Sequence, residues 1–262
     1  WVEDAWSAYR TVNEGFARAV VADAPEGAAV LVQDYHLCLV AAAARAERPD
    51  LRLVHFAHTP FAPPVLLRAL PAVVRHELLE GLAAFHACGF HTARWAGDFE
   101  ASCHDAGIDG PPTFVAPLGP DPADLAGTID SDACRAAAAD LDAEVGERAF
   151  LVRVDRIELS KNVLRGFDAY EALLAADPAR HGTVVFGAYV YPSRAGVAAY
   201  DRYREAVAAR VAEINARFGT DAWTPVIYDP HDDYPRSMAA LARADVVLVN
   251  PIRDGMNLVA KE

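Results

Sequence analysis

The stretch AFLVRVDR at residues 149–156, together with the two segments that follow it, decides the fold class. Its short apolar run predicts a buried strand. Residues 163–177 then repeat apolar side chains with a period near 3.6, which predicts a helix, and TVVFGAYV at 183–190 predicts another strand. Strand, helix and strand in succession indicate a parallel sheet covered by helices.

The same alternation continues on both sides of this stretch. Helical periodicity recurs at residues 71–80 and 200–218. The other strand-like runs are AVLVQDYH (29–36), LRLVHFAHTPF (51–61), TPVIYD (224–229) and DVVLVN (245–250). The sequence therefore predicts an α/β protein with parallel sheets.

One segment interrupts the alternation. Residues 105–146 are rich in Gly, Pro, Asp and Ala, a composition typical of a connection between domains or of a long surface excursion. We place a division inside it, which gives an N-terminal domain over 1–130 and a C-terminal domain over 131–262. The chain lacks a starting Met and stops at VAKE soon after a strand-like run, so we interpret it as an internal fragment that leaves both domains incomplete.

Composition excludes several function classes. The 262 residues carry 24 Lys and Arg against 37 Asp and Glu, and the resulting charge of −13 argues against a nucleic-acid binder. No apolar run reaches the roughly 18 residues that suggest a membrane span. The four cysteines show no CxxC spacing, which indicates buried thiols in a reducing, cytoplasmic environment. We expect no nucleic-acid and no membrane partner.

Polar clusters follow two predicted strands of the first half. In open α/β sheets ligands bind beyond the carboxyl ends of the strands, so these clusters are candidate sites. Asp34 and Tyr35 offer a carboxylate and a phenol suited to sugar hydroxyls, with Asp34 as a helix cap the alternative. His58 lies at the exit of the next strand, with a core histidine the alternative. His55 and His58 point to opposite faces of a strand, so they do not favour a metal site.

Cations follow the strands of the second half. Arg156 and Lys161 leave one strand and precede a helix, and two cations beside backbone N–H groups suit a diphosphate. The chain has only two lysines, Lys161 and Lys261, which weakens the alternative of a solvated loop. Arg194 follows the next strand and suits a phosphate monoester.

The final segment, RDGMNLVAKE, supplies further candidates. Gly255 allows close approach of a ligand to the backbone. We expect a helix to begin here, with backbone amides that donate to sugar or phosphate oxygens, or with Asp254 or Asn257 as an ordinary cap. Glu262 suits a ribose diol. The candidates of this segment are Asp254, Gly255, Met256, Asn257, Leu258 and Glu262.

These clusters, in this order, resemble one family. The motifs DYHL, HTPF, GFHT, VDRIELSKN, PSR and RDGMNLVAKE look like trehalose-6-phosphate synthases of retaining glycosyltransferase family 20, as do WSAYRTVNEGFA and INARFGTDAWTPV. The resemblance spans nearly the whole chain. It implies a GT-B fold of two Rossmann-like domains that transfers glucose from a nucleoside-diphosphate glucose to glucose 6-phosphate. It implies no cofactor and no metal, and it allows a homo-oligomer.

The resemblance also implies residue roles. Asp34, with Tyr35, would bind the acceptor, and His58 would contact the donor glucose. Arg156 and Lys161 would bind the donor diphosphate and stabilise it as leaving group, and Arg194 would hold the acceptor phosphate. Asp254 and the backbone of residues 255–258 would bind the donor sugar, and Glu262 the ribose. The catalytic set would be Asp34, His58, Arg156 and Lys161.

The chain departs from the family pattern near these residues. The usual VDRLDYIKG is VDRIELSKN here, with Asn162 in place of Gly, and GFHT replaces the commoner GFQT. These changes leave open whether the donor carries UDP or GDP and which acceptor is used. The alternatives are a related transferase with another acceptor, such as a glucosylglycerol-phosphate synthase or a validamycin-type pseudo-glycosyltransferase, and a silent sugar-phosphate-binding homologue. The fragment alone is expected to be inactive.

Overall fold

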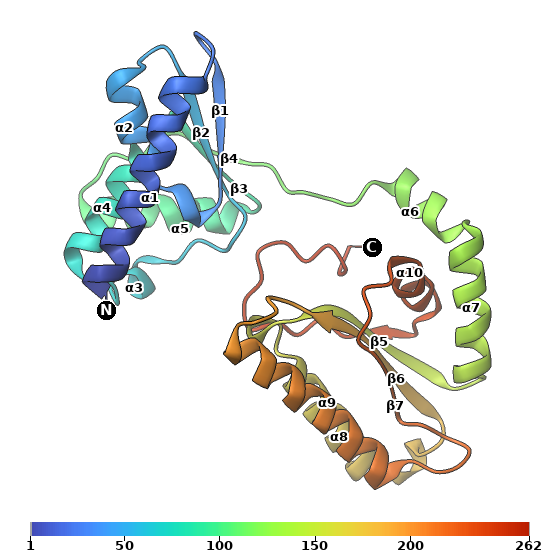
Figure 1. The fold of residues 1–262 in the computed structure, drawn as a ribbon. Helices are drawn as coiled ribbons and strands as arrows, with labels where there is room; N and C mark the ends of the chain where they lie inside the picture. The colour runs from blue at the N-terminus through green and yellow to red at the C-terminus, as the bar shows by residue number, and fades with distance from the viewer. Residues whose placement is uncertain (1, 262) are drawn as a thin grey trace. The chain divides into compact units, whose positions relative to one another are not determined.

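The structure is a computed structural model that describes residues 2–261 (Figure 1). It contains two compact units, one up to Leu118 and one from Gly119 onward. The division that we placed between residues 130 and 131 falls between the helices α6 (Pro122–Ile129) and α7 (Asp132–Val145), and both helices belong to the second unit.

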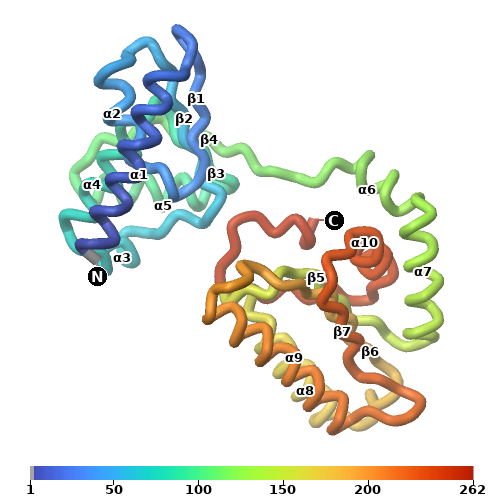
Figure 2. The backbone as a smooth tube through the Cα atoms, in the orientation of Figure 1, coloured from blue at the N-terminus to red at the C-terminus, as the bar shows by residue number. Residues whose placement is uncertain are grey.

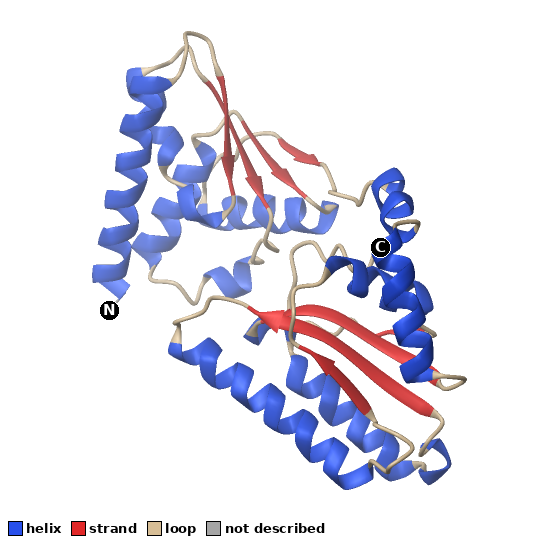
Figure 3. Cartoon of the chain, turned by 45° about the vertical axis from the view of Figure 1, so that its right-hand side comes forward, coloured by secondary structure: helices blue, strands red, loops and turns tan. Residues whose placement is uncertain are grey.

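The first unit is a parallel sheet with helices packed along it (Figures 1 and 3). The strands lie in the order β1-β2-β3-β4, and each pairs in parallel with its neighbour. They are β1 (Ala29–Gln33), β2 (Arg52–Ala57), β3 (Ala87–Phe90) and β4 (Thr113–Val115). The helices are α1 (Val2–Asp23), α2 (Val40–Glu47), α3 (Pro64–Leu67), α4 (Ala72–Ala83) and α5 (Ala93–Ala106), and a 3-10 turn, η1, covers Tyr35–Leu37.

The two faces of this sheet differ in burial. One face joins the helices in an apolar core that includes Val32, Leu53 and Phe90. On the other face Leu31 and Phe114 remain exposed. Because side chains alternate between faces along a strand, the helix-packed face of β2 carries His55 and the other carries Phe56.

The second unit is a parallel sheet covered on both faces (Figure 2). Its strands lie in the order β7-β6-β5-β8. They are β5 (Ala149–Ile157), β6 (Val184–Pro192), β7 (Val226–Asp229) and β8 (Val246–Val247). In addition to α6 and α7 the unit contains η2 (Leu159–Lys161), α8 (Val163–Ala176), η3 (Pro178–Arg180), α9 (Ala198–Phe218) and α10 (Tyr234–Arg243). In Figure 1, α8 and α9 lie on one face of the sheet and α7 and α10 on the other.

The expected α/β class with two parallel sheets is confirmed. The long central strand β6 reads as a continuous apolar run because helices cover both faces of the sheet, whereas the second half of β5 carries charged residues. None of the helices formed by residues 2–261 has the length and apolar character that crossing a bilayer requires.

Gly187 in β6 is required by the packing of this core. A Cβ at this position would lie 2.6 Å from Cζ of Phe150, a ring that solvent does not reach. We predict that Gly187→Ala lowers the free energy of unfolding by about 1–3 kcal/mol through overpacking. Urea unfolding measures it.

Gly127→Ala is the matched control. A Cβ on Gly127 in α6 meets nothing within 4 Å, so alanine should leave stability unchanged or raise it by up to about 1 kcal/mol. Equal effects of the two substitutions would contradict the packing argument.

Candidate functional site

Three non-glycine residues of the described chain adopt positive φ angles, and two of them, Asp34 and Arg194, are candidate site residues. The three are Asp34 and Asn162, each at 60°, and Arg194 at 50°. Asp34 directly follows β1, Asn162 directly follows η2 beyond β5, and Arg194 is the second residue after β6. Such conformations persist where the surrounding structure holds them, and they gather at functional sites.

Asp34 is held by hydrogen bonds from β2 and the loop after it. Its carboxylate Oδ1 accepts from the backbone N–H of His58 at 3.2 Å, and from both the backbone N–H at 3.2 Å and the hydroxyl at 3.1 Å of Thr59. Its own N–H donates to the carbonyl of Phe56 at 2.7 Å. The side chain makes no capping bond to η1, so Asp34 joins two strand ends rather than capping a helix.

His55 and His58 contact Asp34 through different atoms. Nε2 of His55 donates to the carbonyl oxygen of Asp34 at 2.9 Å, while His58 contacts the carboxylate through its backbone. Burial lowers the pKa of His55, so its imidazole is neutral at physiological pH. No group of three or more His, Cys, Asp or Glu side chains within residues 2–261 is arranged to hold a metal ion.

Helix α1 fixes the segment that carries Tyr35. The Tyr9 hydroxyl donates to the Tyr35 carbonyl at 2.7 Å and accepts from the N–H of Cys38 at 3.0 Å. Asn13 donates through Nδ2 to the His36 carbonyl at 3.2 Å and accepts through Oδ1 from the N–H of Leu39 at 2.9 Å. Tyr9 and Asn13 were not predicted as site residues from the sequence. Their signal is a polar pair at i, i+4 on one face of the first helix.

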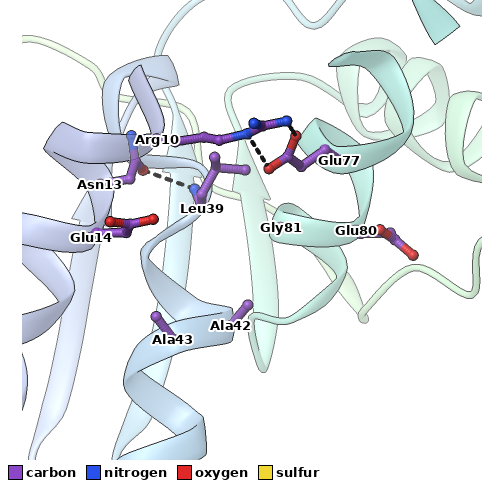
Figure 4. A pocket seen from close by; sticks show the side chains of 9 residues that line it. All are labelled: Arg10, Asn13, Glu14, Leu39, Ala42, Ala43, Glu77, Glu80 and Gly81. Carbon is purple, nitrogen blue, oxygen red and sulfur yellow. Dashed lines mark hydrogen bonds and ion pairs between the residues drawn. The ribbon is translucent and has the colours of Figure 1, made fainter. Parts of the chain in front are cut away.

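Figure 4 shows a groove that Asn13 helps to line, and it draws the Asn13–Leu39 hydrogen bond and the Arg10–Glu77 ion pair. Arg10 donates to both carboxylate oxygens of Glu77, at 2.7 and 2.5 Å, and the hydrogen bonds from Arg10 lower the pKa of Glu77. The Trp6 indole donates to the same carboxylate at 2.7 Å. These contacts join α1 to α4 and so hold the helix that positions Tyr35.

In the second unit Lys161 lies between two carboxylates. Its ammonium is 3.1 Å from Oδ1 of Asp155 and 2.6 Å from Oδ2 of Asp254. Only 12% of the side chain is exposed. Burial alone would lower the pKa of Lys161, but the hydrogen bond to Asp254 and the charge of Asp155 outweigh it and raise that pKa. Lys161 is therefore a desolvated cation at neutral pH, at the carboxyl end of β5.

Behind Lys161 lies a completely buried arginine that the sequence analysis did not select. Arg153 donates to Oδ2 of Asp155 at 2.9 Å, and also to the Lys161 carbonyl and to Oδ1 of Asn250. Gly166 in α8 makes room for the guanidinium, since a Cβ there would lie 2.8 Å from Nη1. The sequence signal was an arginine between two valines in the strand-like run AFLVRVDR.

Asn162 explains how the chain departs from the family's usual glycine. The residue has φ 60° and ψ 38°, a left-handed conformation that glycine adopts freely and that Asn tolerates better than most residues. Its side chain donates to the Asn250 carbonyl at 3.1 Å, and the Asn250 amide donates back to the Asn162 carbonyl at 3.4 Å. Asn162 therefore keeps the backbone geometry and ties the end of β5 to the segment after β8.

Glu158 connects Arg156 to the loop that carries Arg194. It lies 2.9 Å from the half-exposed Arg156 guanidinium and accepts from the Ser193 hydroxyl at 2.9 Å. Ser193 precedes Arg194, whose guanidinium lies over the Tyr200 ring at 5.3 Å from its centroid. The structure thus places Arg156, Lys161 and Arg194 at the same end of one sheet.

The segment after β8 differs from the expectation in one respect. Residues 251–261 form turns, not the start of a helix. Oδ1 of Asn257 accepts from the N–H of Ala260 at 3.2 Å, as a helix cap does, but only a single turn follows within the described residues. Asp254 also accepts from the N–H of Gly255 at 3.0 Å. Glu262, expected at the ribose, lies outside the described residues.

The sequence model of glycosyltransferase family 20 matches residues 2–262. The chain belongs to this family. Among curated relatives, the bifunctional trehalose-6-phosphate synthase/phosphatase of Thermoproteus tenax is 36% identical over 99% of this chain and 37% of its own length. The UDP-forming alpha,alpha-trehalose-phosphate synthase of Schizosaccharomyces pombe is 33% identical over 99% of this chain and 54% of its own length.

Solved structures of family 20 proteins share this fold. One is described as trehalose-6-phosphate from E. coli bound with UDP-2-fluoro glucose; it is 31% identical, has a TM-score of 0.89, and matches 98% of this chain and 60% of its own. A UDP-forming synthase from Burkholderia xenovorans in complex with glucose-6-phosphate is 30% identical over the same shares, with a TM-score of 0.87. The expected GT-B α/β class is confirmed. The chain spans about half the length of these relatives or somewhat more, and 37% of the bifunctional one.

The buried charges of this unit predict unequal effects for two arginines of β5. Arg153→Met removes the buried partner of Asp155 and should lower the free energy of unfolding by about 3–5 kcal/mol. Arg156→Met removes a half-exposed pair with Glu158 and should cost less than about 1 kcal/mol. Denaturant unfolding of the two variants makes the comparison, and equal losses would show that the Arg153 network does not stabilise the unit.

Proposed function

We propose that this chain forms part of a retaining glucosyltransferase that moves glucose from UDP- or GDP-glucose to glucose 6-phosphate and so makes trehalose 6-phosphate. The family and the names of its relatives support this activity for the complete protein. The observation that carries the proposal is Lys161, a desolvated ammonium fixed between Asp155 and Asp254 at the carboxyl end of β5.

Arg156 and Lys161 bind the donor diphosphate in this proposal. Negative charge develops on the diphosphate as the glycosidic bond breaks, and fixed cations in a desolvated site stabilise it strongly. Lys161 suits this role because Asp155 and the Arg153 network orient it before any ligand arrives. Arg156 has freedom to turn, since half of its side chain is exposed. Asp254 and the backbone of residues 255–258 bind the donor sugar.

The remaining candidates bind the sugars. Asp34 and Tyr35 hold acceptor hydroxyls, Arg194 holds the acceptor phosphate, and His58 contacts the donor glucose. The proposed chemistry proceeds on one face of the sugar. The acceptor oxygen forms its bond to the anomeric carbon on the side from which the diphosphate leaves, and a diphosphate oxygen takes the acceptor's proton. This route needs no protein nucleophile.

We also propose that the reaction uses neither a cofactor nor a metal, because Arg156 and Lys161 supply the positive charge that a bound cation would contribute. A cytoplasmic location fits the cysteines: Cys38, Cys88, Cys103 and Cys134 are all buried free thiols, as in proteins of reducing compartments.

Release of nucleoside diphosphate tests the activity. The complete protein encoded by the gene is incubated with UDP-glucose or GDP-glucose, with and without glucose 6-phosphate, and the product is identified by mass. We expect release that depends on glucose 6-phosphate, together with a phosphorylated disaccharide. A folded protein that binds nucleotide but releases none from either donor would instead support a pseudo-glycosyltransferase or a silent homologue.

The charge roles predict a contrast between two cations. Lys161→Ala should lower kcat about 100-fold, since the ammonium acts mainly on charge that develops during bond breaking. Arg194→Ala should instead raise the KM for glucose 6-phosphate about tenfold or more, as expected for one lost charge-assisted hydrogen bond. Steady-state kinetics in both substrates separate the two effects.

Each of the two role assignments has its own contradicting result. A Lys161→Ala variant with normal kcat removes Lys161 from the leaving-group site. An unchanged KM for glucose 6-phosphate in Arg194→Ala removes Arg194 from the acceptor site.

A further inference from the structure

A chain of hydrogen bonds runs through two imidazoles at the carboxyl ends of β2 and β3. The backbone N–H of Leu118 donates to Nδ1 of His91 at 3.4 Å. Nε2 of His91 lies 3.3 Å from Nδ1 of His58, and Nε2 of His58 lies 2.7 Å from Oε1 of Gln33. His91 is buried, with 2% of its surface exposed, and none of the roles proposed above uses it.

The groups at the two ends of this series of hydrogen bonds, Leu118 and Gln33, determine which atom donates in each bond. A backbone N–H can only donate, so Nδ1 of His91 accepts and the neutral ring carries its hydrogen on Nε2. An amide oxygen can only accept, so His58 carries its hydrogen on Nε2 as well. The central contact is then a donation from Nε2 of His91 to Nδ1 of His58, and both rings are neutral.

Aromatic packing fixes the planes of the two rings. The Phe56 ring lies 4.9 Å from the centroids of both His58 and His91, edge-on to His91. Gly89 allows this, since a Cβ on Gly89 would lie 2.5 Å from Cδ2 of Phe56 and 2.4 Å from Cζ of Phe114. Trp95 of α5 packs against His91 from another direction, at 6.1 Å between centroids. His91 therefore has a defined ring position from which to donate.

We propose that His91 is a positioning residue that fixes the tautomer and orientation of His58, so that an oxygen of the bound hexose can replace the exposed Gln33 amide as the acceptor of the His58 Nε2–H. This role rests on the proposed function, in which His58 contacts the donor glucose. The ring nitrogen that carries the hydrogen is set by the partner of the other nitrogen. Without His91, Nδ1 of His58 loses its donor, and only the exposed contact between Nε2 and Gln33 still favours one tautomer, so the ring exchanges tautomers and turns more readily.

Two variants of His91 test the proposal. His91→Phe keeps a ring among Phe56 and Trp95 but removes both nitrogens. His91→Gln keeps one acceptor for Leu118 and one donor for His58, so it serves as the matched control. Thermal unfolding of both variants confirms that they are folded before they are compared.

The first readout is the pair of imidazole ¹⁵N shifts of His58 in the complete protein without substrates. We expect separated Nδ1 and Nε2 shifts, as for a single Nε2–H tautomer, in the wild type and in His91→Gln. In His91→Phe the two shifts should move toward each other as tautomers exchange. Unchanged His58 shifts in His91→Phe would overturn the proposal, and this result does not depend on any activity.

The second readout is kinetic. His91→Phe should lower kcat/KM for the nucleoside-diphosphate glucose about tenfold, near the upper end of what one hydrogen bond contributes, and leave the KM for glucose 6-phosphate unchanged. His91→Gln should recover most of that loss. Equal losses in both variants would assign His91 a purely structural role. Absence of nucleotide release from the wild type would contradict the proposed function instead, while leaving the ¹⁵N result interpretable.

Discussion

A guanidinium that water does not reach organises the carboxyl end of the second sheet. Arg153 contacts the Asp155 carboxylate, the Lys161 carbonyl and the Asn250 side chain at once. A buried ion needs compensating charge and hydrogen bonds, so each of these partners has to lie where it does. Lys161 is in turn held by Asp155 and Asp254, which produces an alternating row of two cations and two anions. The segments after β5 and after β8 are thereby fixed to one another.

In the first unit, neutral hydrogen-bond donors, not buried cations, fix the backbone after a strand. Asp34 has φ 60° and ψ −176°, a region almost restricted to glycine, and a strained backbone of this kind costs on the order of 1–3 kcal/mol. Hydrogen bonds from His58 and Thr59 to its carboxylate, and from His55 to its carbonyl, offset that cost. In both units, therefore, polar contacts from the neighbouring strand end help to place the backbone after a strand.

Sequence patterns predicted the parts of the fold that have strong periodicity. The strands β5 and β6 and the helices α8 and α9 lie within a few residues of their expected ranges. The short strand β3 was missed because ACGF contains Cys and Gly, and β4 because three residues show no period. Residues 132–145 were expected in a connection but form α7, whose Ala-rich sequence buries only Cys134, Leu141 and Val145 and so gives a weak apolar stripe.

The candidate residues after the strands could be found because parallel strands place their carboxyl ends together. The role of Arg153 could not be predicted, because a strand pattern does not show which residues will contact a buried charge. The positive φ angles of Asp34 and Arg194 also have no sequence signal, because neither residue type is restricted to that region. The hydrogen bond between His91 and His58 could not be predicted either, because it depends on the register of β2 and β3, which brings the two rings together.

The central claim is that Lys161 is a prepared cation for the donor diphosphate. A crystal structure of the complete protein with UDP and glucose 6-phosphate tests it most directly. We expect diphosphate oxygens within hydrogen-bond distance of the Lys161 ammonium and the Arg156 guanidinium, with Asp155 and Arg153 still paired behind them. A diphosphate bound without contact to either cation, and with Lys161 still paired to Asp254, would contradict it.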